Sequence, residues 1–229
     1  MIKGTDLAYC NPNTDYLAMK NAGIRFAVLK LKQGLGPKDI MFDTHRMGCD
    51  IVGVPWDVYD FCDYRYSAAA NVSNLLRIAN GAWGMGHACK DLEFRAVWGY
   101  PSGSNMLHWC QDYSKAFFDQ TGMVETLYTN RDLLNQMWAV ATDTQKEELA
   151  NHDLWFATHD ETPTPTHLPI LMNQYELDVA VPWCVQRVDL NDLYLDEAGF
   201  EAWKRHQQPL TLEERVLRIE QILTQHGWL

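Results

Sequence analysis

The chain alternates between short apolar segments and longer segments in which apolar positions repeat with helical spacing. The apolar segments are rich in β-branched and aromatic residues and are bounded by turn-forming residues, a pattern typical of β-strands. Eight strands are predicted in this way, at residues 2–8, 24–31, 51–61, 85–94, 123–129, 154–158, 169–175 and 184–190. Five helices are predicted between the early strands, at residues 14–21, 39–47, 67–79, 105–120 and 131–151.

Strands that alternate with helices indicate parallel βαβ units. The alternation stops after the sixth strand, because residues 158–168 contain Pro163 and Pro165 and residues 176–183 are too few for a crossover helix. The predicted fold class is therefore α/β, an irregular TIM-like barrel of five βα units followed by strands that join through loops. Such a barrel is compact beside the roughly 250 residues of a regular (β/α)8 barrel.

A second, helical part follows the last strand. Residues 197–206 are predicted to be helical, Pro209 breaks the pattern, and residues 211–228 carry an apolar stripe at 4-3-4 spacing. The stripe consists of Leu212, Val216, Ile219 and Leu223. Two interpretations stay open: a helix packed on the barrel, or a short coiled coil that forms a homo-oligomer. The expected division is a barrel at residues 1–196 and a C-terminal helical extension at 197–229.

Composition narrows the class of partner. The 229 residues include 19 Lys and Arg against 30 Asp and Glu, a formal charge of -11, which argues against a nucleic-acid partner. No apolar run approaches the ~18 to 20 residues of a membrane span, so no membrane partner is expected. No signal peptide follows Met1, and we expect synthesis in the cytoplasm. The six cysteines show no zinc-ligand spacing, so free thiols and no metal or cofactor are predicted.

Four carboxylates fall at the ends of predicted strands. Asp91 and Glu93 stand two residues apart at the end of the fourth strand, so both side chains point to one face. Asp6 comes late in the first strand and Asp189 late in the last. The first and last strands are neighbours in a closed barrel and the fourth lies across from them, so the four carboxylates should surround one mouth. Carboxyl groups that share a concave site have pKa values that differ, so that one can stay protonated while its neighbour is ionised. Cleavage of a glycosidic bond needs one protonated acid and one carboxylate of this kind.

The strand segments also resemble, in order, the motifs of glycoside hydrolase family 25, the Chalaropsis-type lysozymes that include many bacteriophage endolysins. The resemblance rests on residues 3–9, 22–34, 58–61, 91–93, 127–129, 154–157, 174–175 and 188–191. It implies an irregular β/α barrel whose last strands lack crossover helices. It also implies hydrolysis of the β-1,4 bond between N-acetylmuramic acid and N-acetylglucosamine in bacterial peptidoglycan.

The resemblance assigns roles to the four carboxylates. Glu93 corresponds to the general acid that protonates the leaving oxygen and then acts as base toward water. Asp91 would stabilise positive charge or orient the substrate acetamido group as an internal nucleophile, while Asp6 and Asp189 would hold and tune the acids. The Cα atoms of Asp91 and Glu93 should lie ~6.6 to 6.8 Å apart, wider than the ~5 to 5.5 Å between carboxyl groups in double-displacement enzymes, which favours substrate assistance.

Aromatic side chains at or near strand ends are the candidate sugar-binding residues. A sugar cleft could be lined by Tyr59, Tyr128, Tyr175, Trp98 and Tyr100. Each of them could equally be a core or loop-covering residue.

Several residues depart from the family pattern. Cys10 stands where the family commonly has Trp, Asp60 where it has His, and Asn173 where Trp precedes Gln-Tyr. Lys32 replaces a small or hydroxyl residue, and Lys90, before the acidic triplet, should point outward toward the helices. These changes thin the aromatic lining without removing a carboxylate.

Three functions are compatible with these features. The favoured one is a phage-type muramidase, made in the host cytoplasm and acting on the cell wall after release or as part of a virion. The first alternative is a glycan-binding or structural virion component with a barrel of reduced activity, which the loss of Trp positions favours. The second is another glycosidase such as a chitinase-like enzyme, since an Asp-x-Glu strand end also occurs there.

Overall fold

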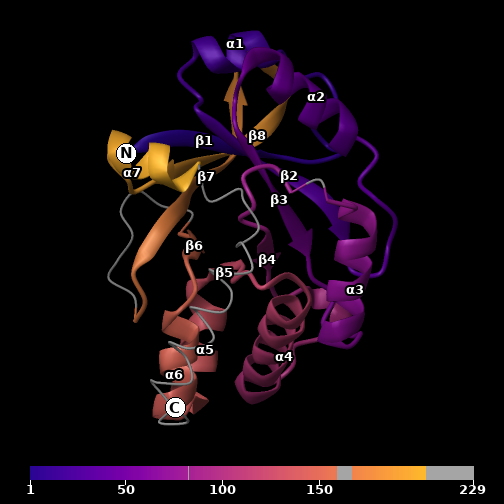
Figure 1. The fold of residues 1–229 in the computed structure, drawn as a ribbon, viewed down its shortest axis with the longest axis vertical. Helices are drawn as coiled ribbons and strands as arrows, with labels where there is room; N and C mark the ends of the chain where they lie inside the picture. The colour runs from indigo at the N-terminus through magenta and orange to yellow at the C-terminus, as the bar shows by residue number, and fades with distance from the viewer. Residues whose placement is uncertain (82, 159–166, 205–229) are drawn as a thin grey trace.

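Eight strands form a closed barrel in the computed structural model, which describes residues 1–81, 83–158 and 167–204 (Figure 1). Each strand pairs with the next one along the chain, and β8 closes the barrel against β1. The strands are β1 (Ile2–Leu7), β2 (Phe26–Gln33), β3 (Trp56–Phe61), β4 (Cys89–Asp91), β5 (Thr126–Asn130), β6 (Leu154–Ala157), β7 (Ile170–Val181) and β8 (Cys184–Leu193). The predicted α/β barrel is confirmed.

The first five connections between strands contain helices, which lie on the outside of the barrel. They are α1 (Tyr16–Asn21), α2 (Phe42–Val52), α3 (Ala68–Ala79), α4 (Gly103–Thr121), α5 (Arg131–Val140) and α6 (Asp143–Ala150). The strands from β1 to β7 are parallel, whereas β8 runs antiparallel to both β7 and β1. The connection from β7 to β8 lacks a crossover helix, as predicted, but β7 continues to Val181, beyond the predicted end at residue 175, and only Pro182 and Trp183 form the turn.

Two element boundaries differ from the prediction for local reasons. The helix predicted at residues 131–151 is two helices, because Ala141 is extended and Thr142 begins α6. Thr142 and Gln145 form a reciprocal capping box there, which satisfies two backbone N–H groups at the new helix start. Residues 51 and 52, predicted as strand, form the last turn of α2, which ends at Gly53 in the left-handed conformation (φ 68°).

The fourth strand is also shorter than predicted. Residues 85–94 contribute only β4, from Cys89 to Asp91. Gly84 and Gly86 precede it with positive φ angles of 60° and 86°, a conformation that does not continue a strand. The short β4 still aligns Asp91 with Phe61 of β3 and Tyr128 of β5. The end of β4 at Asp91 is therefore fixed from both sides, and Glu93 lies beyond the strand, not within it as predicted.

The core has two layers. One apolar cluster lies between the barrel and its helices, and a second fills the barrel interior with residues such as Phe26, Val28 and Met172. Helix α7 (Glu197–Trp203) adds Phe200 and Trp203 to this inner cluster, and the Trp203 ring lies 5.8 Å from that of Phe26. Figure 1 shows α7 beside β1 and β7.

Part of the predicted C-terminal extension is outside the described residues. The stripe of Leu212, Val216, Ile219 and Leu223 belongs to that part, so oligomerisation through it stays a prediction. The division of the chain at residues 196 and 197 also stays a prediction. Within residues 1–81, 83–158 and 167–204, no helix combines the length and the apolar character needed to cross a membrane. All six cysteines are free thiols, as predicted.

Candidate active site

The barrel brings together the four carboxylates that were predicted to share one mouth. Asp6 of β1 and Asp189 of β8 are directly opposite each other in the antiparallel ladder. Asp91 ends β4 and Glu93 follows two residues later. Burial raises the pKa of Asp91 well above its usual range, and the negative charges of Glu93 and Asp6 raise it further. The four acids thus act on one another electrostatically.

Asp6 accepts hydrogen bonds from side chains of two other strands. Its Oδ1 accepts from Asn191 Nδ2 at 2.8 Å and from Gln174 Nε2 at 3.0 Å. Burial, followed by the charge of Asp189, raises the pKa of Asp6 to about 7, while the two amide donors act in the opposite direction. Burial and, after it, the neighbouring negative charge thus favour the protonated form of Asp6.

Two aromatic side chains set the orientation of these amides. Trp155 Nε1 donates to Asn191 Oδ1 at 2.8 Å, and Tyr128 OH donates to Gln174 Oε1 at 2.7 Å. Because each amide oxygen already accepts a hydrogen bond from a ring, each NH2 group is turned toward Asp6. The strands β5 to β8 thereby hold one carboxylate of β1 through two side-chain relays.

Asp91 lies in a different environment. Its side chain is buried, and its Oδ1 accepts no hydrogen bond from any described residue. Lys30 of β2 is the cation that acts on it, because the positive charge of Lys30 opposes the rise in the Asp91 pKa. Burial in turn lowers the pKa of Lys30. Oδ1 of Asp91 is therefore a buried acceptor that no described donor satisfies.

The predicted sugar-binding aromatics separate into two groups. Tyr59 and Tyr128 lie in the barrel mouth, with ring centroids 6.3 and 4.7 Å from that of Trp155. Burial raises the pKa of both phenols well above the usual range, and the charges of Asp6 and Asp91 add to the rise.

The other three aromatics lie farther out. Trp98 ends a short 3-10 helix (Ala96–Trp98) and packs edge-on against Phe61 at 6.0 Å. Tyr100 is 71% exposed and contacts Phe94. Tyr175 is not brought to the carboxylates, because its ring packs under Lys3 Nζ at 4.3 Å. Gln174 points into the barrel, so the next residue along the strand points outward.

The sequence departures have structural partners. Lys32 Nζ lies 2.5 Å from Asp60 Oδ1, and Tyr113 OH donates to Asp60 Oδ2 at 3.0 Å. Lys90 points outward, as predicted, and its Nζ lies 2.8 Å from Glu125 Oε1. These contacts tie β2, β3 and β4 to helix α4 and to the segment before β5.

The remaining departures that the resemblance indicated are Cys10 and Asn173. Cys10 is exposed and its thiol contacts Asn11 Oδ1 at 3.5 Å. Asn173 is fully buried and accepts a hydrogen bond from Thr158 Oγ1 at 3.0 Å. Neither supplies an aromatic surface to the mouth.

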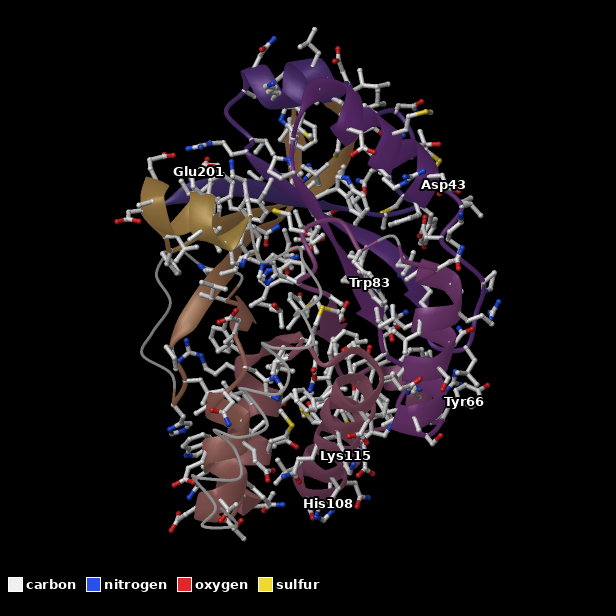
Figure 2. The ribbon with its side chains drawn as sticks, in the orientation of Figure 1. Asp43, Tyr66, Trp83, His108, Lys115 and Glu201 are labelled. Atoms are coloured by element: carbon white, nitrogen blue, oxygen red, sulfur yellow. The ribbon has the colours of Figure 1, made fainter. Side chains whose placement is uncertain are left out.

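A groove of about 420 Å3 lies beside the ends of β2 and β3, with Tyr66 at the edge of the molecule in Figure 2. It is lined by Gln33, Leu35, Gly36, Asp63, Arg65, Tyr66 and Trp98. The sequence pattern singled out only Trp98 among these. The described residues contain no group of three or more His, Cys, Asp or Glu placed to bind a metal ion.

Comparison with known proteins agrees with this geometry. The model of the glycosyl hydrolases family 25 matches residues 5–182. The chain belongs to glycosyl hydrolase family 25. It is therefore a glycoside hydrolase, and the predicted resemblance is confirmed. No curated protein matches this family 25 chain in sequence.

Solved structures share the fold of this family 25 hydrolase. The muramidase from Acremonium alcalophilum is 22% identical with a TM-score of 0.75, covering 90% of this chain and 99% of that chain. The lysozyme from Streptomyces coelicolor is 20% identical with a TM-score of 0.76, covering 90% and 98%. The catalytic domain of an endolysin from a bacteriophage of Listeria monocytogenes is 20% identical with a TM-score of 0.66, covering 90% and 98%.

Proposed function

We propose that this family 25 hydrolase is a muramidase that cleaves the β-1,4 bond between N-acetylmuramic acid and N-acetylglucosamine in peptidoglycan. The observation that carries the proposal is the meeting of Asp6, Asp91, Glu93 and Asp189 at one mouth of a family 25 barrel. Muramidases and lysozymes among the solved structures of this fold support the choice of substrate.

Glu93 is the proposed general acid. It is only partly buried, so its carboxyl group is accessible to the glycosidic oxygen. Transfer of its proton to that oxygen breaks the bond to the anomeric carbon and releases the alcohol of the departing sugar. The Glu93 carboxylate then takes a proton from the water that attacks the anomeric carbon, which restores the acid and completes hydrolysis.

Asp91 is the proposed partner of Glu93. Its buried Oδ1, which lacks a donor among the described residues, suits an N–H donor such as the acetamido group of the substrate. A carboxylate that accepts this hydrogen bond orients the acetamido oxygen toward the anomeric carbon and stabilises the positive charge that develops there. Asp6 and Asp189 supply neighbouring negative charge, which favours retention of a proton within the cluster.

The setting of the enzyme is part of the proposal. An endolysin of a bacteriophage is among the structures with this fold. We infer that the chain is phage-encoded and acts on the host cell wall, either after release from the cytoplasm or as part of a virion.

One observation favours a second candidate function. Cys10 and Asn173 occupy positions where family members commonly have Trp, so the mouth offers less aromatic surface to a sugar. A barrel that binds glycan as a structural virion component, with reduced hydrolysis, would tolerate this loss.

The decisive experiment is digestion of purified peptidoglycan from several bacteria, with mass spectrometry of the released fragments. Fragments that end in reducing N-acetylmuramic acid, absent with Glu93→Gln and present with the exposed control Glu147→Gln, are expected. Intact glycan from every source would favour the binding function. Cleavage of N-acetylglucosamine polymers instead of peptidoglycan would indicate a chitinase-like enzyme.

A further inference from the structure

Cationic and aromatic side chains alternate in a row beside the carboxylates. Lys30 Nζ lies 4.7 Å from the centroid of the Phe61 ring, and the Arg95 guanidinium lies 5.1 Å from the same centroid. Arg95 also lies 5.5 Å from the Trp98 ring, and Arg65 lies 4.8 Å from it. The rings of Phe61 and Trp98 pack edge-on at 6.0 Å. We call this row of Lys30, Phe61, Arg95, Trp98 and Arg65 the cation ladder.

The cation ladder connects the barrel interior with the groove. At its inner end Phe61 is paired with Asp91 across β3 and β4, and Lys30 donates to Gln33 Oε1 at 3.2 Å. At its outer end Trp98 and Arg65 line the groove of about 420 Å3, as does Gln33. A cavity of this size can hold a sugar unit or a short stretch of peptide.

The charges of the cation ladder differ in how they are balanced. Arg65 is neutralised by Asp63, to which Nε and Nη2 donate at 2.9 and 2.6 Å. Arg95 is exposed, and its guanidinium makes no ion pair and no side-chain hydrogen bond with any residue in the described part of the chain. The two rings contact it by cation–π interaction, and no described residue occupies its N–H donors.

An Arg held in this way is preorganised for a planar anion. The guanidinium presents paired N–H donors that match both oxygens of a carboxylate. Asp63 balances Arg65 and Asp91 lies within the electrostatic reach of Lys30, so Arg95 is the cation of the ladder that a negatively charged ligand group would complement.

We propose that the cation ladder is a subsite for a carboxylate of the substrate, with Arg95 as the group that binds it. The inference rests on the muramidase function proposed above, because that substrate carries carboxylates of two origins. One is the lactyl group of muramic acid where the peptide has been removed. The other is the peptide attached to it. Arg95 thus determines specificity for charged over neutral glycan.

Direct binding tests the subsite without requiring hydrolysis. A soluble disaccharide-peptide with free carboxylates and the same compound with amidated carboxylates are titrated into the wild-type protein by calorimetry. Amidation should weaken binding about tenfold, and Arg95→Gln should abolish this difference while Arg95→Lys retains part of it. Lys115→Gln is the control for loss of one positive charge, because Lys115 lies on α4, well separated in Figure 2 from Tyr66 of the groove.

Equal affinity of the wild-type protein for the charged and amidated compounds would overturn the subsite. So would an Arg95→Gln variant that still discriminates between them. Both results can be obtained even if the protein hydrolyses nothing. Absence of hydrolysis would contradict the muramidase function without contradicting the subsite.

Hydrolysis identifies the source of the carboxylate. KM is measured for peptidoglycan with intact peptides and for the same glycan after enzymatic removal of the peptides. A rise of about tenfold in KM for Arg95→Gln, with kcat unchanged, is expected on the substrate that carries the recognised carboxylate. A rise confined to intact peptidoglycan assigns the subsite to the peptide, and a rise confined to the stripped glycan assigns it to the lactyl group. An unchanged KM on both substrates contradicts the role of Arg95.

Discussion

Lys32 of β2 and Asp60 of β3 form an ion pair whose two side chains are completely buried, with Nζ and Oδ1 2.5 Å apart. The residues are aligned with each other across the irregularity in register between β2 and β3. Lys32 also donates to Gly34 O at 2.8 Å, and Tyr113 of α4 donates to Asp60. The two departures from the family pattern are thus one compensated pair, placed outside the barrel against α4.

Removal of either charge alone should destabilise the fold strongly. Lys32→Met leaves a buried carboxylate and Asp60→Asn leaves a buried ammonium, and each should lower the free energy of unfolding by about 3 to 5 kcal/mol. The double variant should recover most of that loss, because no buried charge is then unpaired. Urea unfolding of all four proteins gives the coupling energy. The exposed pair of Lys115 and Asp119 is the control, with an expected coupling below about 1 kcal/mol. Additive losses at Lys32 and Asp60 would contradict this account.

Loss of the Asp91 charge should separate activity from stability. Asp91→Asn should lower kcat on peptidoglycan roughly 10²- to 10³-fold, because the group that stabilises the developing positive charge is gone. The melting temperature should stay the same or rise, since burial disfavours this carboxylate in the folded protein. Asp112→Asn on the exposed surface of α4 should change neither quantity. A variant that loses both activity and stability would show that Asp91 supports the fold instead.

The Asp6 carboxyl group should make stability fall as the pH rises toward neutrality. Its pKa is raised to about 7 in the folded protein, so the folded state holds a proton that the unfolded chain releases near pH ~4. The contribution to stability is complete below that value and is lost as the pH passes through about 7. The difference in unfolding free energy between the wild type and Asp6→Asn should therefore shift by about 1 to 3 kcal/mol between pH 4 and 8. A constant difference would contradict the raised pKa.

His152 should act in the opposite direction. Burial, followed by the charge of Lys90, lowers the pKa of His152 to about 4. Its ring nitrogens contact Glu125 O at 3.1 Å and Ser114 Oγ at 3.2 Å. The Glu125 contact and charge oppose the lowering of the pKa but are weaker than burial. The resulting stability is present above pH ~6.5 and is lost as the pH falls through about 4.

Replacement of His152 by Asn tests this contribution, because the Asn amide can still donate to the Glu125 carbonyl but does not titrate. Unfolding free energies measured from pH 7 to 4 should fall about 2 kcal/mol less in His152→Asn than in the wild type. Equal acid sensitivity of the two proteins would show that His152 is already charged in the folded state.

Much of the fold was accessible from the sequence because barrel strands leave strong local patterns. The segments at β1, β2 and β6 are short, apolar and bounded by turn residues, so periodicity alone identifies them. The break between α5 and α6 could not be predicted from hydrophobic spacing, because the apolar spacing continues through it. The capping box of Thr142 and Gln145, which starts α6, consists of polar residues and has no hydrophobic signal. The pattern predicts strand at the last turn of α2 because Ile51 and Val52 favour β structure intrinsically.

Some residues of the candidate site could also be predicted from the sequence, and others could not. Carboxylates at strand ends can be predicted from the sequence to lie close together, because the C-terminal ends of parallel strands share one mouth of the barrel. The roles of Gln174 and Asn191 depend on which atoms β7 and β8 bring to Asp6, which only the register decides. Asn191 could have been noticed two residues after Asp189, on the same face of the strand. The pairing of Lys32 with Asp60 had no such signal.

The donor of Trp155 should matter to the state of Asp6 even though the two side chains share no hydrogen bond. Trp155→Phe keeps an aromatic ring in the barrel interior but removes the N–H that fixes Asn191 Oδ1. The Asn191 amide is then free to turn, and Asp6 loses a donor that lowers its pKa. Activity on peptidoglycan should fall about five- to tenfold. The pH at which Asp6 stops stabilising the fold should also move upward, which a loss of packing would not cause. Trp203→Phe is the matched control, because its buried Nε1 donates to no described residue. Equal pH profiles for the wild type and Trp155→Phe would remove Trp155 from the relay to Asp6.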